Sequence, residues 1–79
     1  RAVVLGDLNV NPGSACGSRR VLGPLLARFR EVDRGRNRPT HPAVGKVDYV
    51  FTRGLRNKGA RIFASPASDH HALMGFVSP

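Results

Sequence analysis

Acidic, amide and imidazole side chains stand at the edges of apolar stretches in three parts of this sequence. They are Asp7 and Asn9 near the start, Asp48 in the middle, and Asp69 and His70 near the end. A carboxylate beside an imidazole raises the basicity of the ring and fixes its tautomer, and a histidine exchanges a proton near neutral pH. Together these residue types are suited to acid–base chemistry. Taken alone, Asp7 and Asn9 also fit a polar turn, because both side chains hydrogen-bond nearby backbone.

Five elements are predicted to position these residues, in the order β-α-β-β-β. The apolar run 2–5 is typical of a strand covered on both faces. Residues 19–32 carry apolar side chains at helical spacing with arginines between them, which predicts an amphipathic helix. Period-two alternation and short apolar runs predict the remaining strands, at 46–52, 60–64 and 72–77.

The segments between these elements are predicted to be loops. Residues 33–45 contain Gly, Pro, Asn and charged side chains without periodicity, which favours a surface loop that includes His41. The residues that follow Gly13 are small, so Cys16 is placed in a loop as well. Because Cys16 is the only cysteine, the chain cannot form an internal disulfide.

The composition is strongly basic. The 79 residues include 13 Lys and Arg against 5 Asp and Glu, which gives a formal net charge of +8. Such a chain attracts polyanions, and nucleic acid is the first candidate partner. The excess of arginine is equally compatible with a GC-rich coding background, since the basic residues are spread from Arg19 to Arg61. No apolar run approaches the roughly 20 residues that cross a bilayer, so no membrane span is predicted.

The expected strand directions bring the polar residues to one edge of the fold. The strand at 46–52 and the last strand should run in the same direction, because the chain reverses twice between them. Asp48 and His70 therefore lie near one rim. An opening strand antiparallel to them brings Asp7 to the same rim. Strand alternation turns His71 away if His70 faces the site.

Three stretches carry a resemblance to a known family: Gly6-Asp7-Leu8-Asn9, Val47-Asp48-Tyr49-Val50 and Ser68-Asp69-His70. In order and context they resemble the later motifs of the endonuclease/exonuclease/phosphatase superfamily, the deoxyribonuclease-I-like metal-dependent phosphodiesterases. Pro39-Thr40-His41-Pro42-Ala43 is also similar to the family's approach to the aspartate strand, where an aromatic residue often stands in place of the histidine. The resemblance implies an α+β fold, with residues 1–79 forming the C-terminal half of a four-layer α/β sandwich whose N-terminal half is absent.

The resemblance also implies hydrolysis of a phosphate ester by in-line attack of water, with Mg²⁺ or Mn²⁺ as cofactor. Asp7 looks like the acid that orients or deprotonates the water. Asn9 and His70 resemble the residues that contact the phosphate. Asp69 is similar to a metal-binding carboxylate, and Asp48 is similar to the acid that orients the histidine.

Part of the family's site has no counterpart in this chain. The family's metal-binding glutamate and its early asparagine and histidine belong to the first half of the fold. Glu31 is no substitute, because it lies on the predicted helix beside basic residues. The chain alone is therefore expected to be inactive, and a parent protein is expected to supply the glutamate from a strand before Arg1.

Two classes of function are compatible with these observations. The resemblance implies a substrate that is nucleic acid or another phosphate ester, and its fold handles DNA, RNA, inositol phosphates and phospholipid headgroups. The basic charge favours a nuclease among these. The alternative, from a different class, is a small basic module that binds nucleic acid without catalysis.

Overall fold

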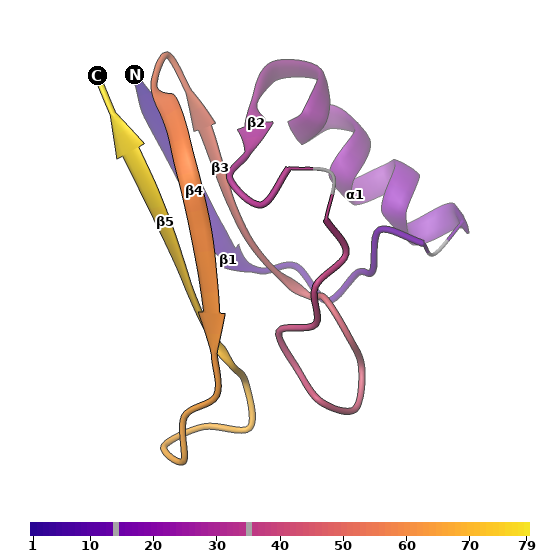
Figure 1. Cartoon of the computed structure of the whole chain (residues 1–79). Helices are drawn as coiled ribbons and strands as arrows, with labels where there is room; N and C mark the ends of the chain where they lie inside the picture. Colours follow the sequence, from indigo (N-terminus) through magenta and orange to yellow (C-terminus); the bar gives the residue numbers. More distant parts are fainter. Residues whose placement is uncertain (14, 35) are drawn as a thin grey trace.

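The computed structural model describes residues 1–13, 15–34 and 36–79, and only the backbone of residues 15–17. The chain forms a small mixed α+β domain with two antiparallel sheets and one helix (Figure 1). No helix in the described part is long and apolar enough to cross a membrane. The elements, in chain order, are β1 (Ala2–Asp7), α1 (Ala15–Arg28), β2 (Arg30–Glu31), β3 (Asp48–Arg53), β4 (Arg56–Phe63) and β5 (Ala72–Ser78).

The central strand of the first sheet is β3, which pairs with β1 on one edge and with β2 on the other. Both pairings are antiparallel. The β1–β3 register pairs Ala2 with Arg53 and ends with Asp7 opposite Asp48. The condition for Asp7 to reach the rim, an opening strand antiparallel to β3, is therefore met, and the register places the two aspartates side by side.

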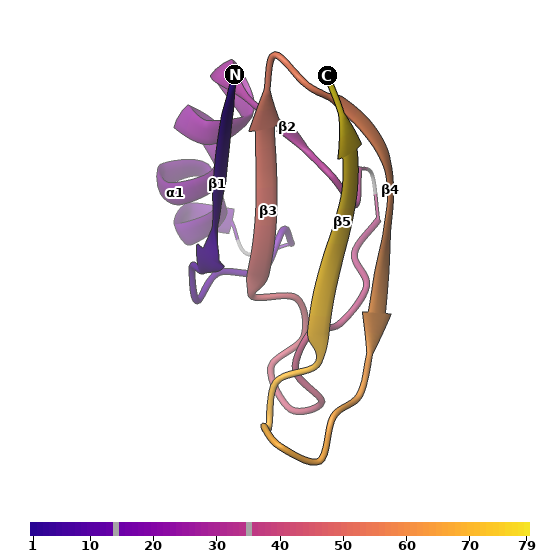
Figure 2. The ribbon, with the colours of Figure 1, turned by 90° about the vertical axis from the view of Figure 1, so that its left-hand side faces the viewer.

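The second sheet is the β4–β5 hairpin, in which Arg56 pairs with Ser78 and Phe63 with Ala72. A register shift between Asn57 and Gly59 interrupts the ladder and is typical of a β-bulge. Figure 2 shows β1, β3, β5 and β4 in this lateral order, with β3 and β5 pointing the same way. The predicted direction of the last strand is thus confirmed.

The helix packs on one face of β1 and β3 (Figures 1 and 2). Its Leu22 joins Tyr49 and Phe51 of β3 in the buried core, where the two aromatic rings stack with centroids 5.6 Å apart. The Tyr49 hydroxyl donates a hydrogen bond to the Val10 carbonyl at 2.7 Å. Burial, followed by the negative charge of Glu31, raises the pKa of Tyr49 to about 12.

The helix begins and ends earlier than the predicted 19–32. It starts at Ala15, so the prediction that residue 16 lies in a loop is wrong, and it ends at Arg28. The apolar spacing continues to Val32, but Glu31 pairs with Phe51 as part of β2, and Val32 N donates to the Val50 carbonyl. Ladder hydrogen bonds to β3 thus override the helical periodicity at this end.

Asp33 and Thr40 are buried, so the prediction of a surface loop over 33–45 is wrong for part of it. Two ion pairs, each with one buried partner, hold this segment to its neighbours. The Lys46 ammonium, only 1% exposed, lies 2.9 and 2.8 Å from the two carboxylate oxygens of Glu31. The buried Asp33 carboxylate accepts hydrogen bonds of 2.6 to 3.1 Å from Arg38. Buried charges are stable only when they are paired in this way. The spacing of apolar residues gives no indication of such pairs in the sequence.

The face of β1 that points away from the helix is largely uncovered. Val4 packs against the core, whereas its neighbours Val3 and Leu5 are 47% and 70% exposed. Met74 and Phe76 of β5 are also exposed. Apolar strand faces of this kind are usually covered by a second layer in a complete domain.

Candidate functional site

The predicted rim forms where β1 ends and β3 begins. The β1–β3 register sets Asp7 opposite Asp48, and cross-strand partners project from the same face of a sheet. His70 lies two residues before β5 and reaches this pair from the neighbouring strand. The side chains of Asp48 and His70 are partly buried, while that of Asp7 is 37% exposed.

The closest contact at the rim joins Asp48 and His70. Asp48 Oδ2 lies 2.7 Å from His70 Nδ1, which confirms the expected hydrogen bond between them. Because a carboxylate only accepts, Nδ1 carries the proton and donates it. The other ring nitrogen, Nε2, faces Asp7 with 3.7 Å between Nε2 and Asp7 Oδ2. The imidazole is therefore held between two carboxylates.

This environment favours the imidazolium form of His70. The hydrogen bond to Asp48 is the largest cause that raises the pKa of His70, and the charges of Asp48, Asp7 and Asp69 add to it. Partial burial opposes the shift without reversing it. The ring therefore stays charged to a higher pH than an isolated histidine.

A buried threonine ties the start of β3 to the segment before β5. Thr40 is 0% exposed, and its Oγ1 accepts hydrogen bonds of 3.1 Å from the backbone N–H groups of Val47 and Asp48. Its carbonyl accepts a 2.6 Å hydrogen bond from the backbone N–H of His71. These three bonds fix the backbone on both sides of the Asp48–His70 contact.

Replacing Thr40 with valine, which has nearly the same shape, should lower the free energy of unfolding by about 1–3 kcal/mol. The cause is the loss of the acceptor for two backbone N–H groups. Thr40→Ser keeps the oxygen and is the matched control, expected to lose less. Chemical denaturation of both variants measures this; equal destabilisation would show that the methyl group, rather than the hydroxyl, holds the site together.

Asp7 and Asn9 form the polar turn that their residue types allow. Asp7 Oδ1 accepts a 2.9 Å hydrogen bond from the Asn9 backbone N–H. Asn9 has a φ of 54°, a left-handed conformation that asparagine tolerates better than most residues. The turn occupies Oδ1 and leaves Oδ2 on the side of His70, so the turn and a catalytic role for Asp7 are compatible.

His41 belongs to the site, although the sequence predicts only a loop residue there. Its Nδ1 accepts hydrogen bonds from the backbone N–H groups of Ala43 and Val44 at 3.0 and 3.3 Å. The neutral ring therefore carries its proton on Nε2, which lies 3.4 Å from Asp69 Oδ2. The His41 ring meets that of His70 edge to face, with centroids 5.1 Å apart. The unusual histidine within Pro39-Thr40-His41-Pro42-Ala43 is the sequence signal for this placement.

Asp69 is the most exposed acid of the site, with a side chain 79% exposed. The hydrogen bond from His41 is the largest cause that lowers the pKa of Asp69, and the charges of His41 and His70 contribute further. A carboxylate kept ionised and open to solvent is a suitable partner for a cation.

Two groups of potential metal ligands occur within the described residues: His41, Asp69 and His70, and Asp7, Asp48 and His70. Both are only partly suited to Mg²⁺ or Mn²⁺, which prefer oxygen ligands. Asp48 is committed to His70 Nδ1, and His41 presents a proton rather than a lone pair on Nε2. Asp69 in the first group and Asp7 in the second each offer one carboxylate to a divalent cation, and further oxygen ligands are required in either group.

Two other acids and one histidine contribute little to such a site. Glu31 is bound to Lys46 and Asp33 to Arg38, so neither is available as a ligand. His71 belongs to neither ligand group. It lines a recess of about 190 Å³ together with Asp7 and Asp48, so the residue stays near the rim, although it is His70 that forms the ion pairs with these two acids.

Comparisons of the chain with protein-family models, with curated proteins and with solved structures each return no match. The geometry of the rim and the basic composition are therefore the basis for a functional assignment.

Proposed function

We propose that this chain is the C-terminal part of a divalent-metal-dependent phosphodiesterase of the endonuclease/exonuclease/phosphatase type, folded as half of a four-layer α/β sandwich. The observation that carries the proposal is the position of His70 between two acids, 2.7 Å from Asp48 and 3.7 Å from Asp7. An imidazolium held in this way is suited to contact a phosphate oxygen through Nε2.

In this proposal each residue of the rim has one task. Asp48 fixes the His70 tautomer and supports its positive charge. Asp7 uses its free Oδ2 to orient and deprotonate the attacking water, while its other oxygen holds the turn. Asn9, next to this turn, binds the phosphate. Asp69 provides a carboxylate for Mg²⁺ or Mn²⁺, a cation that neutralises charge on phosphoryl oxygens when bound.

The proposal requires a companion half. Asp69 alone does not complete the oxygen shell of a divalent cation, because Asp7 is assigned to the turn and to the attacking water. A glutamate from another segment of the parent protein would complete it. The exposed apolar face around Val3 and Leu5 is suited to receive the layer that carries this glutamate.

The 79-residue chain alone should show no phosphodiesterase activity above background, because it lacks part of the metal site and of the positioning that in-line transfer needs. The measurement is nicking of supercoiled DNA with Mg²⁺ or Mn²⁺. The parent protein, run beside it, should nick DNA and lose the activity in chelator. Metal-dependent turnover by the isolated chain would contradict the requirement for a companion half.

The second candidate function is a basic nucleic-acid-binding module without catalysis. It is favoured by the charge distribution: of the 13 Lys and Arg, only Arg38 and Lys46 form ion pairs within the described residues. The same nicking assay separates the two candidates. Salt-sensitive binding of DNA by a parent protein that cannot cleave it would favour the module.

A further inference from the structure

Basic side chains gather around a hollow that is lined by none of the rim residues Asp7, Asp48 and His70. β3 runs from Asp48 to Arg53, a length of roughly 17 Å at 3.3 Å per residue. Five exposed basic residues line a hollow of about 680 Å³ at its far end and along the segment after β2. This basic groove consists of Arg30, Arg34, Arg36, Arg56 and Lys58.

The positive charge of the basic groove is not neutralised within the described residues. None of its five basic side chains forms an ion pair there, and the acids that lie nearby are already paired. Asp33, which lines the groove, is bound to Arg38, and Glu31 is bound to Lys46. The groove therefore presents guanidinium groups, whose planar donors match phosphate oxygens.

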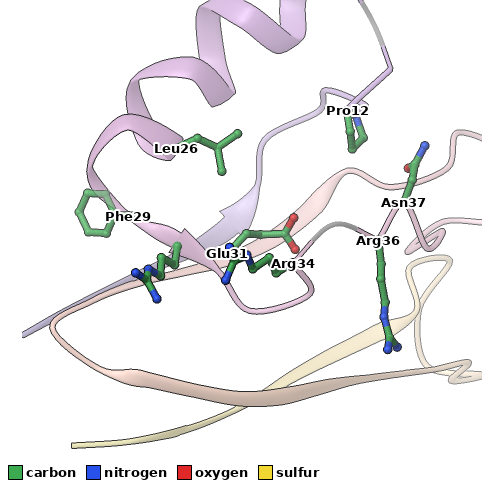
Figure 3. Close-up of a pocket in the computed structure, with 8 residues that line it drawn as sticks. Pro12, Leu26, Phe29, Glu31, Arg34, Arg36 and Asn37 are labelled. Carbon is green, nitrogen blue, oxygen red and sulfur yellow. The ribbon is translucent and has the colours of Figure 1, made fainter.

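A recess that shares three arginines with the basic groove lies beside it, and Figure 3 shows the residues that line this recess. This recess of about 490 Å³ has a mixed lining. It consists of the apolar Pro12, Leu26 and Phe29, the groove residues Arg30, Arg34 and Arg36, and Asn37 and Glu31, the last bound to Lys46. Leu26 is 56% exposed, although Leu22 of the same helix is part of the buried core. A flat aromatic ring could occupy the recess while a phosphate attached to it meets the arginines.

We propose that the basic groove and its recess bind single-stranded nucleic acid, with phosphates on the arginines and one base against Leu26 and Phe29. Single strands expose base faces for such contacts, whereas a duplex keeps its bases stacked and paired. The groove lies away from Asp7 and His70, so this binding is independent of the proposed catalysis. In a nuclease it would hold the strand beyond the cleavage site.

The test measures binding of a fluorescent oligothymidylate of about ten nucleotides, in chelator so that no cleavage occurs. Arg34→Ala/Arg36→Ala should weaken binding about tenfold and reduce the slope of log K against log salt by about 1.4, the value for two lost phosphate contacts. Arg19→Ala/Arg61→Ala removes the same charge from exposed positions outside the groove. This control should stay within about threefold of the wild type.

The base contact is tested separately. Leu26→Gln, which removes the apolar contact without changing the charge, should weaken oligothymidylate binding about tenfold, and the wild type should bind a duplex of equal length less tightly. If the two double arginine variants lose the same affinity, the groove is not the binding site, because net charge alone would then explain the binding. Equal or tighter binding of the duplex would overturn the recess as a base site. Neither outcome depends on whether the parent protein cleaves DNA.

Discussion

Replacing Asp48 with asparagine should lower the turnover number of the proposed parent phosphodiesterase by about 10²-fold or more, with substrate affinity changed less than about threefold. Asp48 contacts His70 at Nδ1, whereas Nε2, on the other side of the ring, is the atom assigned to the phosphate. Asparagine keeps the size of the side chain but cannot support the imidazolium charge. The loss therefore falls on the chemical step, and kcat and KM measured across pH should separate the two effects.

The pH dependence has a defined sign. Asp48 raises the pKa of His70, so the charged ring persists to higher pH and activity falls only as pH rises through this raised value. In Asp48→Asn the pKa returns toward the ordinary 6.5, and the alkaline fall moves to lower pH. If Asp48 is only a structural surface acid, kcat and the alkaline limb should both stay unchanged.

Asp7→Asn should lower turnover by about 10²- to 10⁴-fold, the range typical for loss of a general base. The substitution is well matched to the structure, because the asparagine side-chain oxygen can still accept the Asn9 backbone N–H that Oδ1 accepts now. Only the charge and basicity at Oδ2, 3.7 Å from His70, are removed.

Two controls make the Asp7 result interpretable. At a pH above the raised pKa of His70, the unfolding midpoint of Asp7→Asn should match that of the wild type, since the turn is kept. Asp7→Ala breaks the turn as well and should lower both stability and turnover. Full activity in Asp7→Asn would remove the general-base assignment and leave only the turn.

The convergence of the site was predictable because it depends on strand parity. Asp48 starts β3, Asp7 ends the antiparallel β1, and His70 precedes β5, so the reversals of the chain place all three at one rim. The alternation of side chains along each strand determines which face of the sheet a residue occupies, and it can be read from neighbouring residues in the sequence. A one-residue change of register would move each of these side chains to the other face. The helix and the four longer strands were predicted for the same reason, with errors at their ends.

The missed features depend on contacts between distant residues. β2 exists because Glu31 pairs with Phe51, and the segment after it is anchored by Lys46 and Arg38, which neutralise buried acids. Hydrophobic periodicity contains no signal for such pairs. His41 was missed because its role follows from backbone N–H groups that fold back onto Nδ1.

The most direct test of whether Asp7, Asp48 and His70 form one functional site is an NMR titration of the His70 ring in the 79-residue chain. The pKa of His70 should lie above 6.5, fall toward 6.5 in Asp48→Asn, and fall less in Asp7→Asn, because the hydrogen bond to Asp48 is the larger cause. Because the pKa is raised on folding, the pair should stabilise the fold fully below pH 6.5 and lose this contribution as pH rises through the folded value. A His70 pKa at or below 6.5 that stays unchanged in both variants would contradict the claim that the three residues form one site.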